Sequence, residues 1–520
     1  MKRLFVDRSH IQRLDRVRQI FHQPVKDAGP VVAPDRPWEE ERLHIWSAPI
    51  WCADRQRWRM WYIGGEDLLP LYAESMDGLH WEKPVLDRVD WNGSRENNIV
   101  NLGFEAQDAK ERRLVLLRDD RDPLPARRYK ALTRVSGRLV GLASPDGLDW
   151  ASLPGAAVPS NDEYRLGYDS IRQQFLATVK GSPVPEFGRA VSLSVSDDFV
   201  HWSPNELIFW GDQVDQELGR QRIAQAMNDP DRRSPQVNDP ALSHTDIYNM
   251  PVFSYADLYL GLPVVFNHSG LYWYRHPDDD PPKLRSNQDG ILQPSLVSSQ
   301  NLVDWERGDR APFIPLSPLS DPANYDHGAI HACAPVIAGD ELWFYYTGTR
   351  FTHLKRSLIE EAGLRTSPDE PMGAIFRARL RLDGFASLTA GSDPGVVLTR
   401  PVEVEGPHLY VNADASRGEI RVELRDAASG RVIPGYGMGD MMGDPWLYSD
   451  DGQSRRLRFG TGARFEDDMR TDDSLSIREN GTAIPVRWKA APDVRALLGR
   501  RIRICFRLRD ADLFAFEFGA

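Results

Sequence analysis

Short hydrophobic stretches rich in aromatic residues recur along this chain, and residues that favour turns separate them. Five such stretches stand out: RWRMWYIGG (57–65), RYKALTRV (128–135), QFLATVKG (174–181), YLGLPVVF (259–266) and LWFYYTGT (342–349). Aromatic and β-branched residues in runs of this length are typical of β-strands. The pattern therefore predicts an all-β protein built from strand hairpins.

A seven-residue pattern accompanies these stretches: Ser, any residue, Asp or Asn, three residues, Trp. Its four copies run from Ser75 to Trp81, from Ser144 to Trp150, from Ser196 to Trp202 and from Ser299 to Trp305. We expect a strand to end at the Ser, the Asp or Asn to cap the turn, and the Trp to open the next strand. Repetition of one sheet unit predicts a five-bladed β-propeller, in which radial closure protects the sheet edges.

The repeat ends before the last quarter of the chain, and alternating strands without the Trp turn follow it. We therefore divide the chain into a five-bladed β-propeller over residues 1–393 and a C-terminal antiparallel β-sandwich over residues 394–520. Residues 1–36 are expected to supply a strand that closes the propeller ring. A partial helical stripe predicts a helical insertion within residues 211–240.

Composition narrows the class of protein. The 520 residues are 41% hydrophobic and 27% charged, which is an ordinary globular balance. The net charge of -12 argues against a nucleic-acid partner, because phosphate binding needs a basic surface. We find no apolar run long enough for a signal peptide or a membrane helix, so we expect a cytoplasmic protein with no membrane partner. Cys52, Cys333 and Cys505 are expected to be buried thiols.

The hairpins RWRMWYIGG and LWFYYTGT and the turns SMDGLHW and SPDGLDW resemble the five-bladed propeller glycoside hydrolases. That superfamily includes invertases and levanases, arabinanases and xylosidases, neoagarobiose hydrolases and mannoside phosphorylases. The segment RPVEVEGPHLYVNADASRGEIRVEL (400–424) resembles the sandwich of bacterial members labelled invertase-like. The resemblance implies a bacterial glycosidase of carbohydrate metabolism, acting on a carbohydrate, with a furanoside such as a fructoside or arabinoside favoured, and no cofactor.

Glycosidic cleavage usually needs two carboxyl groups, one as proton donor and one as base or nucleophile. In a propeller such groups converge from the entrances of the inner strands. We therefore propose Glu39, Asp162 and Asp246 as the catalytic acids, with Glu39 or Asp246 as the proton donor and Asp162 as the base or charge stabiliser. Invertase-like enzymes carry a catalytic Asp in the first blade, but the matching stretch LHIWSAPIW (43–51) has none.

Other polar and aromatic residues near the same strand entrances are candidates for substrate binding. They are Trp46, Asn98, Tyr248, Asp326, His327, His331, Arg350 and His353. Trp46 and Tyr248 are suited to stacking on a sugar ring, and His331 could replace a missing acid. We expect no metal site, since no His-Glu-x-x-His or Cys-x-x-Cys pattern occurs.

Two other functions remain open at this stage. A phosphorylase or transglycosylase on the same fold would need a basic pocket, and Arg350, His353 and Lys355 lie close together in sequence. A non-catalytic sugar-binding or scaffold protein would account for the missing first-blade Asp. A homo-oligomer is also compatible with the sequence.

Overall fold

The computed structural model describes most of the chain. The described residues are 1–105, 112–135, 138–158, 160, 162–229, 243–275, 281, 284–321, 323–354, 356–361, 363–364, 370–439 and 472–520. They form two compact units, one of Met1–His22 with Asp383–Ala520 and one of Gln23–Leu382. Nearly all regular structure in both units is β-strand, which confirms the all-β prediction.

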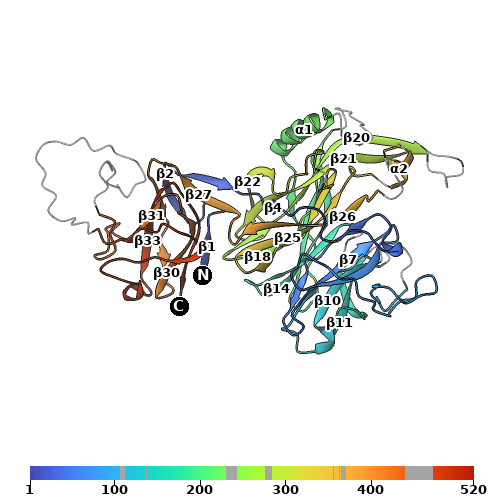
Figure 1. Cartoon of the computed structure of the whole chain (residues 1–520), viewed down its shortest axis with the longest axis horizontal. Coiled ribbons are helices and arrows are strands. Elements are labelled where there is room, and N and C mark those ends of the chain that lie inside the picture. Colours follow the sequence, from blue (N-terminus) through green and yellow to red (C-terminus); the bar gives the residue numbers. More distant parts are fainter. Residues whose placement is uncertain are drawn as a thin grey trace, which may run out of the picture. The chain divides into compact units, whose positions relative to one another are not determined.

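Three antiparallel four-stranded sheets lie in the unit Gln23–Leu382 (Figure 1). The first contains β5 (Leu43–His44), β6 (Ile50–Cys52), β7 (Arg57–Gly64) and β8 (Leu69–Ser75). The second contains β9 (Val115–Arg118), β10 (Tyr129–Val135), β11 (Arg138–Ser144) and β12 (Ala151–Val158). The third contains β13 (Tyr164–Asp169), β14 (Gln174–Val184), β15 (Gly188–Ser196) and β16 (Glu206–Trp210). Each of the last two sheets follows chain order from strand to strand.

The remaining strands of this unit form one eleven-stranded sheet. Its earlier part contains β17 (Thr245–Asn249), β18 (Val252–Tyr255), β19 (Leu258–Gly261), β20 (Val264–Arg275), β21 (Leu284–Ser299) and β22 (Trp305–Pro312). Its later part contains β23 (Ala329–Ala332), β24 (Val336–Ala338), β25 (Glu341–Thr349), β26 (Gly373–Arg381) and β4 (Val25–Lys26). A single parallel pairing, Leu292 with Ala329, joins the two parts.

The four predicted turns share one hydrogen-bond pattern. In the first, Asp77 Oδ1 accepts from the backbone N–H groups of Leu79 and His80, both at 2.8 Å, and Ser75 Oγ accepts from Gly78 N at 2.8 Å. Gly78 has φ +71°, the left-handed conformation that glycine adopts without a steric penalty. The same acceptor positions recur at Asp146, Asp198 and Asn301 in the other copies.

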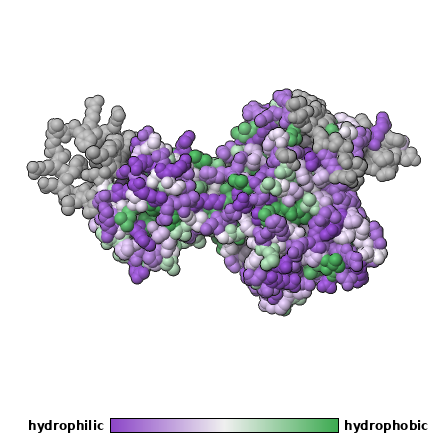
Figure 2. Space-filling view, viewed as in Figure 1, coloured by the Kyte–Doolittle hydropathy of each residue, from purple (hydrophilic) through white to green (hydrophobic). Residues whose placement is uncertain are grey.

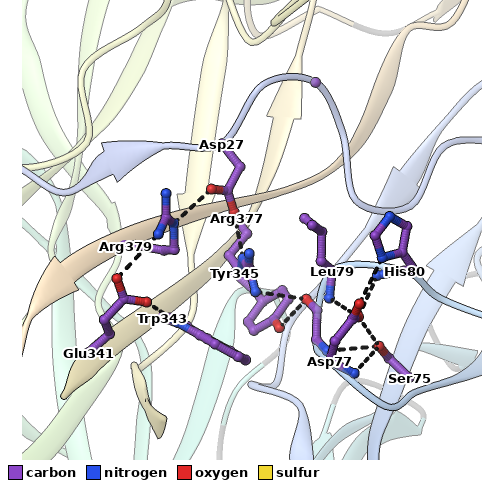
Figure 3. Close-up of polar contacts among 12 residues, drawn as sticks. Asp27, Ser75, Asp77, Leu79, His80, Glu341, Trp343, Tyr345, Arg377 and Arg379 are labelled. Carbon is purple, nitrogen blue, oxygen red and sulfur yellow. Dashed lines mark hydrogen bonds and ion pairs between the residues drawn. The ribbon is translucent and has the colours of Figure 1, made fainter. Parts of the chain in front are cut away.

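The first of these turns lies against the last sheet part of the unit. Tyr345 in β25 donates its hydroxyl hydrogen to Gly78 O at 2.6 Å, and Arg377 Nη1 in β26 donates to the same oxygen at 3.2 Å (Figure 3). A Cβ atom on Gly78 would lie 2.5 Å from the Trp343 ring. The beginning and the end of the unit are therefore neighbours in space.

The other turns contact the sheet that precedes their own. Trp61 Nε1 in β7 donates to Gly147 O at 2.6 Å. Arg127 and Arg172 donate to the backbone oxygens of residues 198 and 301, at 3.2 and 3.1 Å. Together with the β21–β23 pairing, these contacts order the sheets in a closed cycle, as a propeller requires. Division of the eleven-stranded sheet into a fourth and a fifth blade stays a prediction.

The unit Met1–His22 with Asp383–Ala520 contains a six-stranded and a five-stranded sheet. The six strands are β1 (Lys2–Leu4), β3 (Arg18–Phe21), β27 (Ala386–Ala390), β30 (His408–Asp414), β32 (Asn480–Pro485) and β34 (Ala511–Gly519). The five are β2 (Ile11–Asp15), β28 (Gly395–Thr399), β29 (Val402–Glu403), β31 (Glu419–Asp426) and β33 (Arg501–Arg509). Their apolar side chains form one buried cluster, which includes Phe5, Ile420 and Phe506.

The boundaries of the two units differ from the predicted domains 1–393 and 394–520. The predicted ring-closing segment 1–36 serves both units: β1, β2 and β3 pair with β34, β28 and β27, whereas β4 pairs with β26. Backbone pairing explains the difference, because each strand joins the sheet that satisfies its N–H and C=O groups. The structure therefore places the unit boundaries after His22 and Leu382.

Two α-helices are described. Helix α1 (Gln213–Met227) lies within the predicted insertion 211–240, of which residues 230–240 are outside the described part, and it contacts β20 (Figure 1). Asp212 caps α1 by accepting from Val214 N and Asp215 N. Helix α2 spans Arg356–Glu361. Among the described residues, neither helix is long and apolar enough to cross a membrane.

Polar residues dominate the displayed face, and apolar residues occur in scattered small groups (Figure 2). Scattered exposed apolar residues are normal for globular proteins. Cys52, Cys333 and Cys505 are buried thiols, as the sequence predicted.

Candidate functional site

Five side chains from in or beside five different strands form a closed cycle of contacts. Trp46 follows β5, Arg113 precedes β9, Glu163 precedes β13, Asn249 ends β17 and His331 lies in β23. The guanidinium of Arg113 stacks over Trp46 at 4.3 Å and donates from Nη1 to Glu163 Oε1 at 2.9 Å. Asn249 Nδ2 lies 3.3 Å from Glu163 Oε2 and 3.4 Å from His331 Nδ1. The rings of His331 and Trp46, 6.2 Å apart, complete the cycle, which we call the five-residue ring.

Glu163 is the acidic residue of this cycle. From the sequence we selected its neighbour Asp162 and missed Glu163. The side chain of Glu163 is buried, and Arg165 Nη1 lies 4.0 Å from its Oε2. Glu163 and Arg165 are two residues apart at the start of a strand, so they lie on one face, which Asp162 does not share. The alternation Glu-Tyr-Arg was the available signal.

Asp162 remains close to the five-residue ring. Its carboxylate forms a 2.7 Å ion pair with Lys180, and both side chains are 29% exposed. It also interacts electrostatically with Arg113 and Tyr248. Asp162 is thus the most solvent-accessible carboxylate of the group.

Tyr248, a predicted binding residue, lies beside the five-residue ring. Its ring centroid is 5.4 Å from that of His331 and 5.1 Å from that of His353. A register irregularity in β17 between Ile247 and Asn249 interrupts the regular alternation of side chains there. The predicted binding residues Trp46, Tyr248, His331 and His353 are therefore brought together.

Asp246 forms the centre of a second polar group two residues before Tyr248. Arg189 Nη1 donates to its Oδ2 at 2.9 Å, and the Nε2 atoms of His268 and His244 lie 3.2 and 3.6 Å from the same oxygen. Burial raises the pKa of Asp246, but hydrogen bonds from His244 and His268 and the charge of Arg189 outweigh it and hold the pKa far below its usual value. Asp246 is therefore ionised at neutral pH, which is contrary to its predicted role as a proton donor.

His44, His268, His331 and His353 are neutral at pH 7. Burial lowers the pKa of His268 and of His353 to about 4, despite hydrogen bonds that favour the charged form. Burial also lowers the pKa values of His44 and His331 well below the usual range, and nearby guanidinium groups add to this effect. A neutral imidazole accepts or relays a proton more readily than it supplies one.

Glu39 and Asn98 belong to a different network. Glu39 Oε1 accepts from Tyr62 at 2.6 Å, and its Oε2 accepts from Lys83 at 2.7 Å and from two backbone N–H groups. Asn98 donates to the Tyr62 hydroxyl at 2.8 Å and accepts from Trp38. These contacts bind Glu39 into this network, and neither Asp162 nor Asp246 is among its hydrogen-bond or ion-pair partners within the described chain.

Asp326 also lies in a separate group. Its Oδ2 accepts from Lys26 of β4 at 2.6 Å and from Tyr346 of β25 at 3.0 Å. This ion pair ties the segment after His22 to the last sheet part. A strand-anchoring contact of this kind explains the burial of Asp326 without a substrate.

His327 and Arg350 point to other partners as well. His327 Nδ1 lies 3.2 Å from Ser317 O, and Arg350 stacks over Tyr325 at 4.5 Å while its Nε donates to Pro371 O. Lys355, the third member of the predicted basic pocket, is outside the described residues. The structure thus shows Arg350 at a packing contact and His353 beside Tyr248.

His244, Asp246 and His268 form the one group within the described part of the chain whose side chains could hold a metal ion. Their candidate ligand atoms lie within 4.8 Å of one another. Two imidazoles and a carboxylate suit zinc or another transition metal. The guanidinium of Arg189 already bonds to Asp246 Oδ2 and lies 3.4 Å from His268 Nε2, so a metal ion would have to compete with a fixed positive charge.

No family model matches this sequence, and no curated protein matches it. Solved structures do resemble its fold. An N-acetylgalactosamine deacetylase from F. plautii in complex with blood group B trisaccharide is 13% identical, with 70% of this chain and 96% of that chain covered and a TM-score of 0.39. A glycosyl hydrolase from Bacteroides ovatus is 12% identical, with 70% and 93% covered and a TM-score of 0.39.

Proposed function

We propose that this protein is a glycoside hydrolase whose substrate binds at the five-residue ring. The observation that carries the proposal is the convergence of Trp46, Glu163 and His331 from three different strands, with Asp246 and Tyr248 in the neighbouring strand β17. Glycosidases need at least two carboxyl groups with distinct roles, and aromatic side chains that can lie against a sugar ring. The resemblance of the hairpins and turns to propeller glycosidases supports the same function and favours a furanoside.

The carboxylates take different roles in this proposal. Glu163, ion-paired with Arg113, and Asp246, ionised through its His and Arg partners, supply the negative charge that stabilises an oxocarbenium-like transition state. Glu163 also serves as base or nucleophile. We assign proton transfer to Asp162, the carboxyl group that solvent reaches most readily, which acts as donor once the substrate displaces Lys180 from its carboxylate.

Turnover of a broad panel of aryl pyranosides, aryl furanosides and natural oligosaccharides tests this proposal. For a substrate that is cleaved, Glu163→Gln should lower kcat/KM by about 10²–10⁴-fold, the usual loss for an acid–base or nucleophilic carboxylate. Glu39→Gln is the matched control, since it also replaces a buried, ion-paired glutamate but lies outside the ring. Its folded fraction should keep the wild-type kcat/KM. Equal losses in both variants would contradict the assignment.

A second candidate function is carbohydrate binding without cleavage. The observation in its favour is that Asp162, Glu163 and Asp246 each have a cationic partner, as fixed charges in a binding site do. Binding of an intact oligosaccharide by calorimetry, with no product after prolonged incubation, would select this function over hydrolysis. A turnover that Glu163→Gln abolishes would select hydrolysis.

A further inference from the structure

Arg165 is a buried cation with an incomplete set of partners. Its side chain starts in β13, and the residue is 3% exposed. Its Nη1 donates to Tyr164 O at 3.3 Å and lies 4.0 Å from Glu163 Oε2, which is beyond hydrogen-bond distance. Its Nε and Nη2 have no hydrogen-bond partner within the described chain. Three N–H donors of one guanidinium are therefore unsatisfied.

Such an arrangement is costly, because a buried polar group that loses water without gaining a protein partner destabilises the fold. Arg59 shows how the same protein satisfies a buried guanidinium elsewhere. It stacks on Trp61 and donates from Nε to Tyr72, from Nη1 to Tyr129 and from Nη2 to Asp146 O. The contrast indicates that Arg165 lacks a partner among the described residues, a position that a bound ligand would fill.

The surroundings of Arg165 carry a surplus of positive charge. Arg113 lies beside it, and the Nε of Arg113 is also without a hydrogen-bond partner in the described part of the chain. Glu163 is the one carboxylate that contacts both guanidinium groups in the described structure. His44 and His331 interact with both cations, which help to keep the two imidazoles neutral. One further negative charge would balance the pair of arginines.

Trp46 fixes the geometry of the two arginines. The guanidinium carbons of Arg113 and Arg165 lie 4.3 and 4.1 Å from the indole centroid. Stacking on an aromatic face holds a planar guanidinium in place and leaves its N–H edge available. Planar forks of N–H donors match the oxygens of a carboxylate or a phosphate.

We propose that Arg165 and Arg113, held by Trp46, form an oxyanion-binding site within the five-residue ring. The ligand group is an oxyanion. It is either the carboxylate of an acidic sugar or an inorganic phosphate that serves as co-substrate. The carbohydrate nature of the ligand rests on the proposed function, whereas binding of the anion itself does not. The site makes the enzyme selective for an anionic ligand over its neutral analogue.

Calorimetric titration of the full chain with glucuronate, inorganic phosphate and glucose tests the site without any turnover. We expect at least one of the two anions to bind and glucose to bind at least 10-fold more weakly. Glucuronate binding assigns the charge to the sugar, and phosphate binding assigns it to a co-substrate. Absence of binding by both anions, or equal binding of glucose, would overturn the proposal. A failure to cleave glycosides would overturn the proposed function but leave the anion titration unaffected.

Two variants separate a binding role from a structural one. Arg165→Met keeps the side-chain length and apolar stacking but removes the charge, and should weaken anion binding by about 10–100-fold, the usual value of one or two charge-assisted hydrogen bonds. Its melting temperature without ligand should stay at or above that of the wild type. Arg59→Met, the matched control, should lower the melting temperature and leave the affinity of the folded protein unchanged. A lower melting temperature together with unchanged anion affinity in Arg165→Met would overturn the proposal.

Discussion

His353 Nε2 lies 3.1 Å from the hydroxyl oxygen of Tyr248, and this contact joins the segment after β25 to β17. Burial lowers the pKa of His353 to about 4 and raises the pKa of Tyr248, so both groups are neutral at pH 7. The contact is therefore an uncharged hydrogen bond beside the five-residue ring. It positions the Tyr248 ring next to His331 and the proposed substrate site.

Tyr248→Phe removes that hydrogen bond and keeps the aromatic ring. We expect the free energy of unfolding to fall by about 1 kcal/mol, the net value of one ordinary hydrogen bond. We also expect kcat/KM to fall by about 10-fold, because the ring loses its fixed orientation. Chemical denaturation and steady-state kinetics measure the two effects. An unchanged kcat/KM would place Tyr248 outside the substrate site.

Stability should decline as the pH falls from about 6.5 towards 4. His268 and His353 have folded-state pKa values of about 4, below the unfolded value of 6.5. Between these values the unfolded chain binds protons that the folded chain does not, so protonation favours unfolding. Each histidine contributes up to about 3 kcal/mol to this loss. Thermal melting at half-unit pH intervals measures it.

His268→Gln provides the control for this pH dependence. The variant should show a shallower decline over the same pH window, since glutamine does not titrate. Identical slopes in the wild type and His268→Gln would contradict the neutral, buried state assigned to His268.

Closure of the sheet cycle depends on the first repeated turn. Gly78→Ala places a Cβ atom in a left-handed conformation and 2.5 Å from the Trp343 ring, so we expect a loss of about 2–4 kcal/mol from strain and overpacking together. Gly339→Ala is the matched control, since Gly339 also has a positive φ but a Cβ there meets nothing within 4 Å. It should cost about 1 kcal/mol. Denaturant unfolding compares them, and equal losses would contradict the close packing.

Metal removal should leave the protein unchanged. Arg189 donates to Asp246 Oδ2, the same oxygen that His244 and His268 contact. A positive charge therefore already lies where a metal ion would bind. We expect the same melting temperature and kcat/KM before and after dialysis against EDTA. A rise in melting temperature on addition of Zn²⁺ to the wild type, but not to Asp246→Asn, would show that a metal ion displaces Arg189.

The repeated turns could be predicted because their chemistry is local. Within seven residues, Ser75 and Asp77 supply the acceptors, Gly78 supplies the backbone conformation and Trp81 closes the unit. The all-β fold follows from that repeat and from the aromatic strands. The domain boundary could not be predicted in this way, because β1 and β34 pair across almost the whole chain and neither strand shows its partner in its own sequence.

The sequence predicted those residues of the candidate site that can be chosen from their position near an inner strand alone. Trp46, Tyr248 and His331 were found because each lies in or next to an inner strand. Glu163 was missed because its selection over Asp162 depends on which face of β13 meets Arg113, a contact between residues distant in sequence. Glu39 was chosen for its position before β5, but Tyr62 and Lys83 make it part of a closed network.

The pairing of β1 with β34 has a consequence for biosynthesis. On the ribosome, β1, β2 and β3 emerge long before their partner strands β34, β28 and β27, so they stay unpaired while Gln23–Leu382 folds. The unit that contains both ends of the described chain therefore completes its sheets last. Chaperone demand during translation should fall when Met1–His22 is moved to follow Ala520, a circular permutation that brings these strands beside their partners in time.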